Sequence, residues 1–185
     1  WIQEIDGKKY FFGKTSGKLY KGWIDAPDGN RYYTNSDGVL QTGIQEIGGK
    51  KYLFGATSGK LYHGWTETPD HNMYYTNSDG VILTGIQEID GKKYLFGATS
   101  GKLYYGLTPA PDGYTYYADK NGIIQYGWQE IQLDKYYFDE AGHMLIGWND
   151  IANEKYYFDS NGVMYTGIRE IDGKKYLFGA TSGKL

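Results

Sequence analysis

Short alternating stretches of apolar and polar residues recur along the whole chain, and each pair of stretches is followed by turn-forming residues. In residues 148–167, WNDIANEKYYFDSNGVMYTG, two strand-like stretches, 148–151 and 155–158, flank Ala152-Asn153-Glu154. So short a connection between β-prone stretches predicts a hairpin turn. Related stretches carry Asp90-Gly91 or Asp172-Gly173 at this place, or Pro27-Asp28-Gly29 at 27–29, which are strong turn signals. We therefore predict one β-hairpin, followed by a second turn at 159–162 and a short extended segment.

This pattern repeats with a period of 21 residues that shortens to 20 near the end of the chain. Residues 44–64 and 86–106 differ at only two of 21 positions. A fixed period in this range is the signature of supersecondary units stacked on their neighbours. We predict an all-β fold, a β-solenoid of stacked hairpins with about 20–21 residues per repeat, forming one array over 1–185. The expected repeats are 1–22, 23–43, 44–64, 65–85, 86–106, 107–127, 128–147, 148–167 and 168–185. Because the chain stops inside a repeat, we expect a piece of a longer array.

Strand alternation assigns the two faces of each hairpin. In residues 155–158, Tyr156 and Phe158 share one face, while Lys155 and Tyr157 share the other. The first tyrosine of this group is present in all nine repeats, at Tyr10, Tyr32, Tyr52, Tyr74, Tyr94, Tyr116, Tyr136, Tyr156 and Tyr176. The face of this first tyrosine is therefore the predicted core, because an isolated hairpin is marginal in water and must bury its aromatic side chains on its neighbours.

The opposite face divides the repeats into two kinds. Four aromatic repeats carry a Trp after the closing glycine and a second Tyr in the second stretch: Trp23 with Tyr33, Trp65 with Tyr75, Trp128 with Tyr137, and Trp148 with Tyr157. Three aliphatic repeats carry Ile and Leu at these positions: Ile44 with Leu53, Ile86 with Leu95, and Ile168 with Leu177. Leu107 with Tyr117 is intermediate. Since Ile and Leu would serve packing equally well, we interpret the aliphatic repeats as scaffold and the aromatic repeats as a binding surface.

Composition narrows the classes of function. The chain has 21 Tyr, 7 Phe and 5 Trp with 28 Gly, a profile typical of short strands and tight turns. The formal net charge of -3 gives no basic patch for nucleic acid. No apolar run is long enough for a membrane span, so membrane insertion is not expected either. The absence of Cys rules out disulfides and thiolate metal sites.

The aromatic repeats have the chemistry of a carbohydrate site. A sugar ring needs an aromatic plane for its apolar face and polar side chains for its hydroxyls. The candidate ligand-binding residues are Trp23, Tyr33, Trp65, Tyr75, Tyr117, Trp128, Gln129, Lys135, Tyr137, Trp148, Lys155 and Tyr157. The alternative, that these rings only seal the junctions between hairpins, stays open.

Metal binding and catalysis have little support in the sequence. Asp-Ser-Asn-Gly at 159–162 is too compact for a calcium loop, and a turn explains it better. His63, His71 and His143 occupy non-equivalent positions in their repeats, and no nucleophile is arranged with a base. We therefore expect no catalytic residue, no metal and no cofactor.

The stretch from Gly147-Trp148 through Lys155-Tyr156-Tyr157-Phe158 to Met164 resembles the cell-wall-binding or choline-binding repeat superfamily. This superfamily includes choline-binding modules of pneumococcal surface proteins, glucan-binding repeats of streptococcal glucosyltransferases and C-terminal repeats of large clostridial toxins. The resemblance covers the whole chain. It implies a β-solenoid with ligand sites at the junctions between consecutive hairpins, in a protein secreted or displayed on the surface of a Gram-positive bacterium or carried by its phage.

One position separates the branches of the superfamily. Choline-binding members usually place another aromatic residue just before the tyrosine pair, whereas this chain has Lys51, Lys93, Lys135, Lys155 and Lys175, or Arg31, Met73 and Thr115. A fixed positive charge repels a quaternary ammonium, and the Gly-Lys-Lys-Tyr pattern is more similar to the toxin and glucan-binding branches, whose ligands are sugars. We predict a non-catalytic, multivalent carbohydrate-binding module that anchors a secreted bacterial protein to cell-wall or glycan surfaces. The alternatives are a module for choline or teichoic acid, and a structural spacer.

Overall fold

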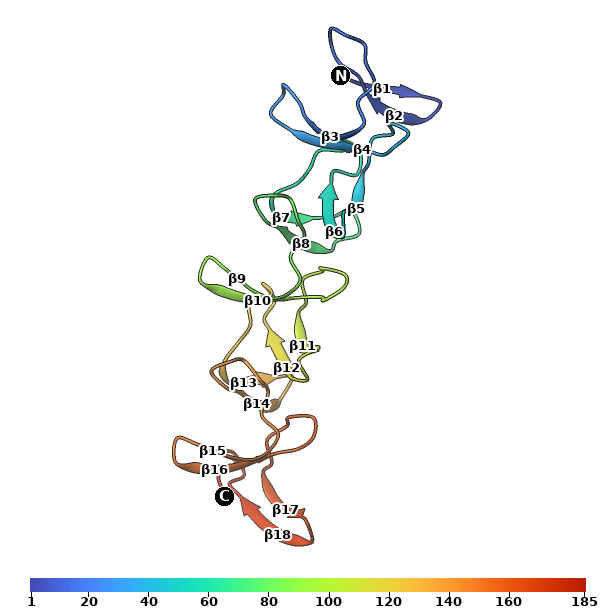
Figure 1. The fold of residues 1–185 in the computed structure, drawn as a ribbon. Helices are drawn as coiled ribbons and strands as arrows, with labels where there is room; N and C mark the ends of the chain where they lie inside the picture. Colours follow the sequence, from blue (N-terminus) through green and yellow to red (C-terminus); the bar gives the residue numbers. More distant parts are fainter. The chain divides into compact units, whose positions relative to one another are not determined.

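The computed structural model describes residues 1–185. The chain folds into β-strands joined by turns (Figure 1). Each consecutive pair of strands forms its own two-stranded antiparallel sheet, so every predicted repeat contains one hairpin. None of the elements is a helix long and apolar enough to cross a membrane. The strands are β1 (Ile2–Ile5), β2 (Lys8–Phe11), β3 (Gly22–Asp25), β4 (Arg31–Thr34), β5 (Gly43–Ile47), β6 (Lys50–Phe54), β7 (Gly64–Glu67), β8 (Met73–Thr76), β9 (Gly85–Ile89), β10 (Lys92–Phe96), β11 (Gly106–Pro109), β12 (Thr115–Ala118), β13 (Gly127–Ile131), β14 (Asp134–Phe138), β15 (Gly147–Ile151), β16 (Glu154–Phe158), β17 (Gly167–Ile171) and β18 (Lys174–Phe178).

The hairpins group into two compact units. The first contains Trp1–Gly85 and Phe96–Leu103, and the second contains Ile86–Leu95 and Tyr104–Leu185. The same local architecture recurs inside each unit. The all-β class and the succession of hairpins were predicted correctly.

The β15–β16 hairpin illustrates how the sequence forms each element. The register pairs Trp148 with Tyr157 and Ile151 with Glu154, which leaves Ala152 and Asn153 as a two-residue turn. Both turn residues have positive φ, 51° and 65°, as a type I′ turn requires. The predicted three-residue turn was one residue too long, because Glu154 belongs to β16.

Each hairpin is followed by a tail that makes two backbone contacts. In the tail after β16, the N–H of Tyr165 donates to the carbonyl of Tyr157 at 2.8 Å, which folds the tail onto its own hairpin. The N–H of Met164 donates to the carbonyl of Lys135 at 2.8 Å, which ties the tail to the preceding hairpin. The second contact recurs in both units, at Leu40 with Lys9, Leu61 with Arg31, Ile82 with Lys51, Leu103 with Met73, Ile124 with Lys93, Met144 with Thr115 and Leu185 with Lys155. Neighbouring hairpins are thereby joined in the way that isolated hairpins need for stability.

The core lies on the face that alternation predicts. Tyr156 and Phe158 are 6% and 0% exposed, and they form a cluster with Met164 of the following tail. The position of Phe158 is held by Thr34 and Thr76 in two aromatic repeats of the first unit, and both are fully buried. Their hydroxyls donate to the carbonyls of Tyr20 and Tyr62 at 3.0 and 2.9 Å, so the buried polar groups are satisfied.

The second turn of the repeat is built by an aspartate and a glycine. The Oδ1 atom of Asp159 accepts hydrogen bonds from the N–H groups of Asn161 and Val163 at 2.8 and 2.9 Å. Gly162 has a φ of 81°, and a Cβ there would lie 2.4 Å from Sδ of Met144. The turn therefore requires glycine for its backbone conformation, and a Cβ would also displace the flexible side chain of Met144 in the preceding tail.

Candidate functional site

The strand register places the Trp and the second Tyr of an aromatic repeat directly opposite each other. Trp128 pairs with Tyr137 across β13 and β14, and their ring centroids lie 5.1 Å apart at an angle of 78°. Residues directly opposite in an antiparallel pair have their side chains on the same face. The two rings therefore form one aromatic surface on the outer face of the hairpin.

The next hairpin completes this aromatic surface. The ring of Tyr156 lies 5.0 Å from that of Trp128 at 64°, and Phe158 lies 6.0 Å away. The same arrangement surrounds Trp23, with Tyr33, Tyr52 and Phe54, and Trp148, with Tyr157, Tyr176 and Phe178. Trp65 contacts Tyr75 and Phe96 in the same way. We call each group of a Trp with its surrounding rings an aromatic junction site.

A cavity of about 430 Å³ lies beside Trp128. The indole is 42% exposed, so its ring is open to this cavity. The lining combines aromatic, amide and charged side chains: Trp128, Gln129, Glu130, Lys135, Tyr156, Met164, Ser182 and Lys184. Gln129 and Lys135 are held by backbone carbonyls, because Gln129 donates to Tyr126 at 2.9 Å and Lys135 donates to Thr181 at 3.1 Å. The apolar indole of Trp128 thus shares the cavity with amide, carboxylate and ammonium groups.

The structure brings most of the predicted site residues together in pairs. Each predicted Trp lies against the second Tyr of its own hairpin, at 5.0–5.1 Å between centroids. Gln129 and Lys135 share the cavity with Trp128, and Nζ of Lys155 lies 5.9 Å from the ring centroid of Trp148. Tyr117 differs, since it faces Leu107 across the strands and stacks on Phe138 at 6.0 Å.

Two features of the junction sites were missed by reasoning within single hairpins. The first tyrosine of the next hairpin was assigned only to the core, yet Tyr52, Tyr156 and Tyr176 also contact a Trp. The guanidinium of Arg31 lies 4.5 Å from the centroid of Trp23. In the sequence, the oppositely charged Asp25 and Arg31 lie on either side of the turn at 27–29, and the register pairs them beside Trp23 and Tyr33. This charge pair is the sequence signal for the contact.

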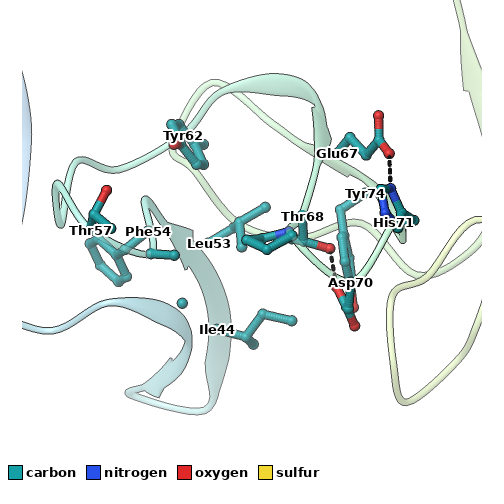
Figure 2. Close-up of a pocket in the computed structure, with 13 residues that line it drawn as sticks. Ile44, Leu53, Phe54, Thr57, Tyr62, Glu67, Thr68, Asp70, His71 and Tyr74 are labelled. Carbon is teal, nitrogen blue, oxygen red and sulfur yellow. Dashed lines mark hydrogen bonds and ion pairs between the residues drawn. The ribbon is translucent and has the colours of Figure 1, made fainter.

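A larger cavity of about 580 Å³ lies between an aliphatic repeat, which the sequence indicated only as scaffold, and the hairpin that follows it. Figure 2 shows Ile44 and Leu53 on one side of this cavity, with Tyr74 and the turn around Asp70 nearby. Ile44 and Leu53 occupy the positions of the Trp and second Tyr, and their smaller side chains leave more space. The carboxylates at the rim are already engaged, because Glu67 binds Nδ1 of His71 at 2.9 Å and Asp70 accepts from Thr68 at 2.6 Å (Figure 2).

Buried first tyrosines are anchored by aspartates of the hairpin turns. The hydroxyl of Tyr32 donates to Asp28 at 2.9 Å, and burial together with this bond raises the pKa of Tyr32 to about 12. Hydrogen bonds hold the pKa of Asp28 below its usual range, and the bond from the backbone N–H of Asn30 has the largest effect. Tyr116 and Asp112 repeat the arrangement at 2.6 Å, with the tyrosine pKa raised mainly by burial. These two pairs fix the turns of their own hairpins to the core.

The fold and the junction sites define a class: an all-β protein built from hairpin repeats, with aromatic surface sites where consecutive hairpins meet. The family model for the choline-binding repeat matches residues 145–185, and the model for a putative cell wall binding repeat matches residues 21–40. No curated protein matches the chain.

Solved structures show the same fold along the whole chain. Choline binding protein F from Streptococcus pneumoniae is 26% identical, with a TM-score of 0.70, over 100% of this chain and 85% of that chain. Its structure in the presence of a peptidoglycan analogue, a tetrasaccharide-pentapeptide, gives 25% identity and a TM-score of 0.69 over 100% and 86%. Together with the two family-model matches, these similarities support a cell-wall-binding and choline-binding repeat superfamily.

Proposed function

We propose that this chain is a non-catalytic module that attaches a bacterial protein to the cell surface by binding the cell wall at its aromatic junction sites. The observation that carries this proposal is the recurrence of one arrangement, a Trp between tyrosines of two hairpins, at several places in the chain. Equivalent sites along an array favour multivalent attachment, since linked weak sites raise the overall affinity through effective concentration.

A carbohydrate of the wall is the ligand that the Trp128 cavity favours. Its volume, about 430 Å³, is within the range of small-ligand sites. The indole offers a plane for the apolar face of a sugar ring, and Gln129, Glu130 and Lys184 offer acceptors and donors for hydroxyl groups. Choline binding protein F, a relative by fold and sequence, was crystallised in the presence of a peptidoglycan analogue.

Choline carried on a wall polymer is the second candidate. The tyrosine rings around each Trp lie at 4.9–5.1 Å and at steep angles, so several ring faces and edges converge on one place. Aromatic faces attract quaternary ammonium groups. The matches to the choline-binding repeat and to choline binding protein F support this candidate. The lysines at the Trp128 cavity oppose it, because an ammonium repels a second cation.

The hairpin-to-hairpin contacts also support a β-solenoid as the arrangement of the repeats. The same backbone hydrogen bond from a tail to the preceding hairpin recurs with the repeat period in both units. Such stacking would present the junction sites of each unit as a series along its hairpins.

A retention experiment distinguishes the two ligands. The protein is bound to insoluble cell walls of a Gram-positive bacterium and eluted in parallel with free choline and with a soluble N-acetylglucosamine tetrasaccharide. We expect elution by the tetrasaccharide. Elution by choline alone would favour the second candidate, and no retention on the walls would contradict the proposed function.

The matched control for this experiment uses aliphatic repeats. The double variant Ile86→Ala with Ile168→Ala changes residues at the position of the Trp that are 38% and 68% exposed. Its retention on the walls should equal that of the unchanged protein, because neither residue lies in an aromatic junction site.

A further inference from the structure

The ring face of Trp23 is covered by a cation of its own hairpin. The guanidinium carbon of Arg31 lies 4.5 Å from the ring centroid, within the range of a cation–π contact. Arg31 is held there by Asp25, its cross-strand partner, whose Oδ1 lies 3.2 Å from Nε. The guanidinium therefore has both an aromatic face and a carboxylate as partners.

In another aromatic repeat, the lysine at the position of Arg31 binds a backbone carbonyl and not the Trp ring. Lys135 precedes the first tyrosine of its repeat, as Arg31 does, but its Nζ donates to the carbonyl of Thr181 at 3.1 Å. Lys9 and Lys51 make the same bond, at 2.7 Å, to Thr57 and Thr99. Lys135 thus lines the wall of the 430 Å³ cavity, and Trp128 stays accessible there.

Lys155 is intermediate between these two cases. Its Nζ lies 5.9 Å from the ring centroid of Trp148 and 4.0 Å from Asp150. Trp23, which lies beside Arg31, is half-buried, whereas Trp148 is 36% and Trp128 is 42% exposed.

We propose that the residue before the first tyrosine is a specificity-determining cover, which sets whether each aromatic junction site is open to an external ligand. Arg31 acts as an internal ligand of Trp23 and closes that site, whereas Lys135 is withdrawn to Thr181 and leaves the Trp128 site open. A sugar ring or a quaternary ammonium must displace Arg31 before it reaches the Trp23 face. This inference rests on the proposed function, in that the exposed ring face is taken as the binding face.

The substitution Arg31→Thr tests the cover, because Thr115 occupies the same position in a sister hairpin. The indole N–H signals of the 15N-labelled protein report each Trp separately. In the unchanged protein, choline and an N-acetylglucosamine tetrasaccharide are each titrated, and for at least one of them Trp128 should respond at lower concentration than Trp23. In Arg31→Thr the concentration needed at Trp23 should fall at least about threefold, in line with the loss of a cation–π contact.

The variant Lys9→Thr is the matched control. It removes one positive charge from the equivalent position of the first repeat, where Nζ of Lys9 donates to the carbonyl of Thr57. The response of Trp23 should therefore change less in Lys9→Thr than in Arg31→Thr. Equal gains at Trp23 in the two variants would mean that net charge, and not a cover on the ring, controls access, and would overturn the inference.

A measurement without ligand separates failure of the cover from failure of the binding function. A neutral nitroxide in solution broadens the indole signals that it can approach. We expect stronger broadening at Trp23 in Arg31→Thr and no change at Trp23 in Lys9→Thr. Unchanged broadening at Trp23 would contradict the cover itself. Stronger broadening with no response of any indole to either probe would contradict both the binding function and the proposed role of the cover in it.

Discussion

The hydroxyl of Tyr32 couples the stability of the fold to pH. Its pKa is about 12 in the folded protein, against an ordinary value of 10.0, mainly because of burial and also because it donates to Asp28. A pKa that is higher in the folded state gives stability that is complete below pH 10 and is lost as the pH rises toward 12. We expect the urea midpoint to fall across this window.

Other first tyrosines should contribute to the same loss, since burial also raises the pKa of Tyr74, Tyr94, Tyr116 and Tyr136. The control is Tyr32→Phe, which keeps the ring but removes one ionisable group. Its midpoint should decline less between pH 10 and 12 than that of the unchanged protein. Equal declines for the two proteins would show that Tyr32 ionises alike in the folded and unfolded states.

Residue-level alternation predicted the core well and the junction sites only in part. Tyr156 and Phe158 face the interior, as their period of two requires. Contacts between hairpins, such as Trp128 with Tyr156, depend on the path of the tail that joins them. A pattern within one strand carries no information about that path. The charge of Arg31 was recognised as unfavourable for choline, but its place over Trp23 depends on the register with Asp25.

At the scale of the element, the β13–β14 turn contains a strained residue. Leu133 has a φ of 150°, a conformation that favours glycine, and its side chain is 92% exposed. The sister turn Asp172-Gly173 has glycine at this place with a φ of 74°. Leu133→Gly should raise the free energy of unfolding by about 1 kcal/mol, measured by urea denaturation.

The control for this turn is Leu133→Ala, which removes the exposed apolar side chain but keeps a Cβ. It should give little or none of the gain, because the backbone conformation stays unfavourable for an L-residue. A gain as large as that of Leu133→Gly would show that the effect comes from removing the exposed apolar side chain.

Turns such as Asp90-Gly91 were predictable from sequence. Gln132-Leu133 has no turn signal, and its conformation is imposed by the strands on either side.

At the scale of the whole molecule, the aromatic and the aliphatic repeats form the same two-stranded hairpin. The repeat period, the hairpins and the core tyrosines predicted the all-β class. The cavity beside Ile44 and Leu53 was not predicted, because residues of two consecutive hairpins line it and the pattern within one repeat does not show how the two meet. The aliphatic repeats nevertheless show that Ile is compatible with the fold at the position of each Trp.

Attachment of the protein to cell walls should depend on the Trp residues of the aromatic repeats. The most direct test replaces Trp23, Trp65, Trp128 and Trp148 together by Ile, the residue of the aliphatic repeats. The fraction of protein that sediments with insoluble cell walls is then measured, with the fold checked by far-ultraviolet circular dichroism. We predict a folded variant that stays in the supernatant, while the unchanged protein sediments with the walls. A folded variant that sediments as fully as the unchanged protein would show that attachment does not depend on these Trp residues.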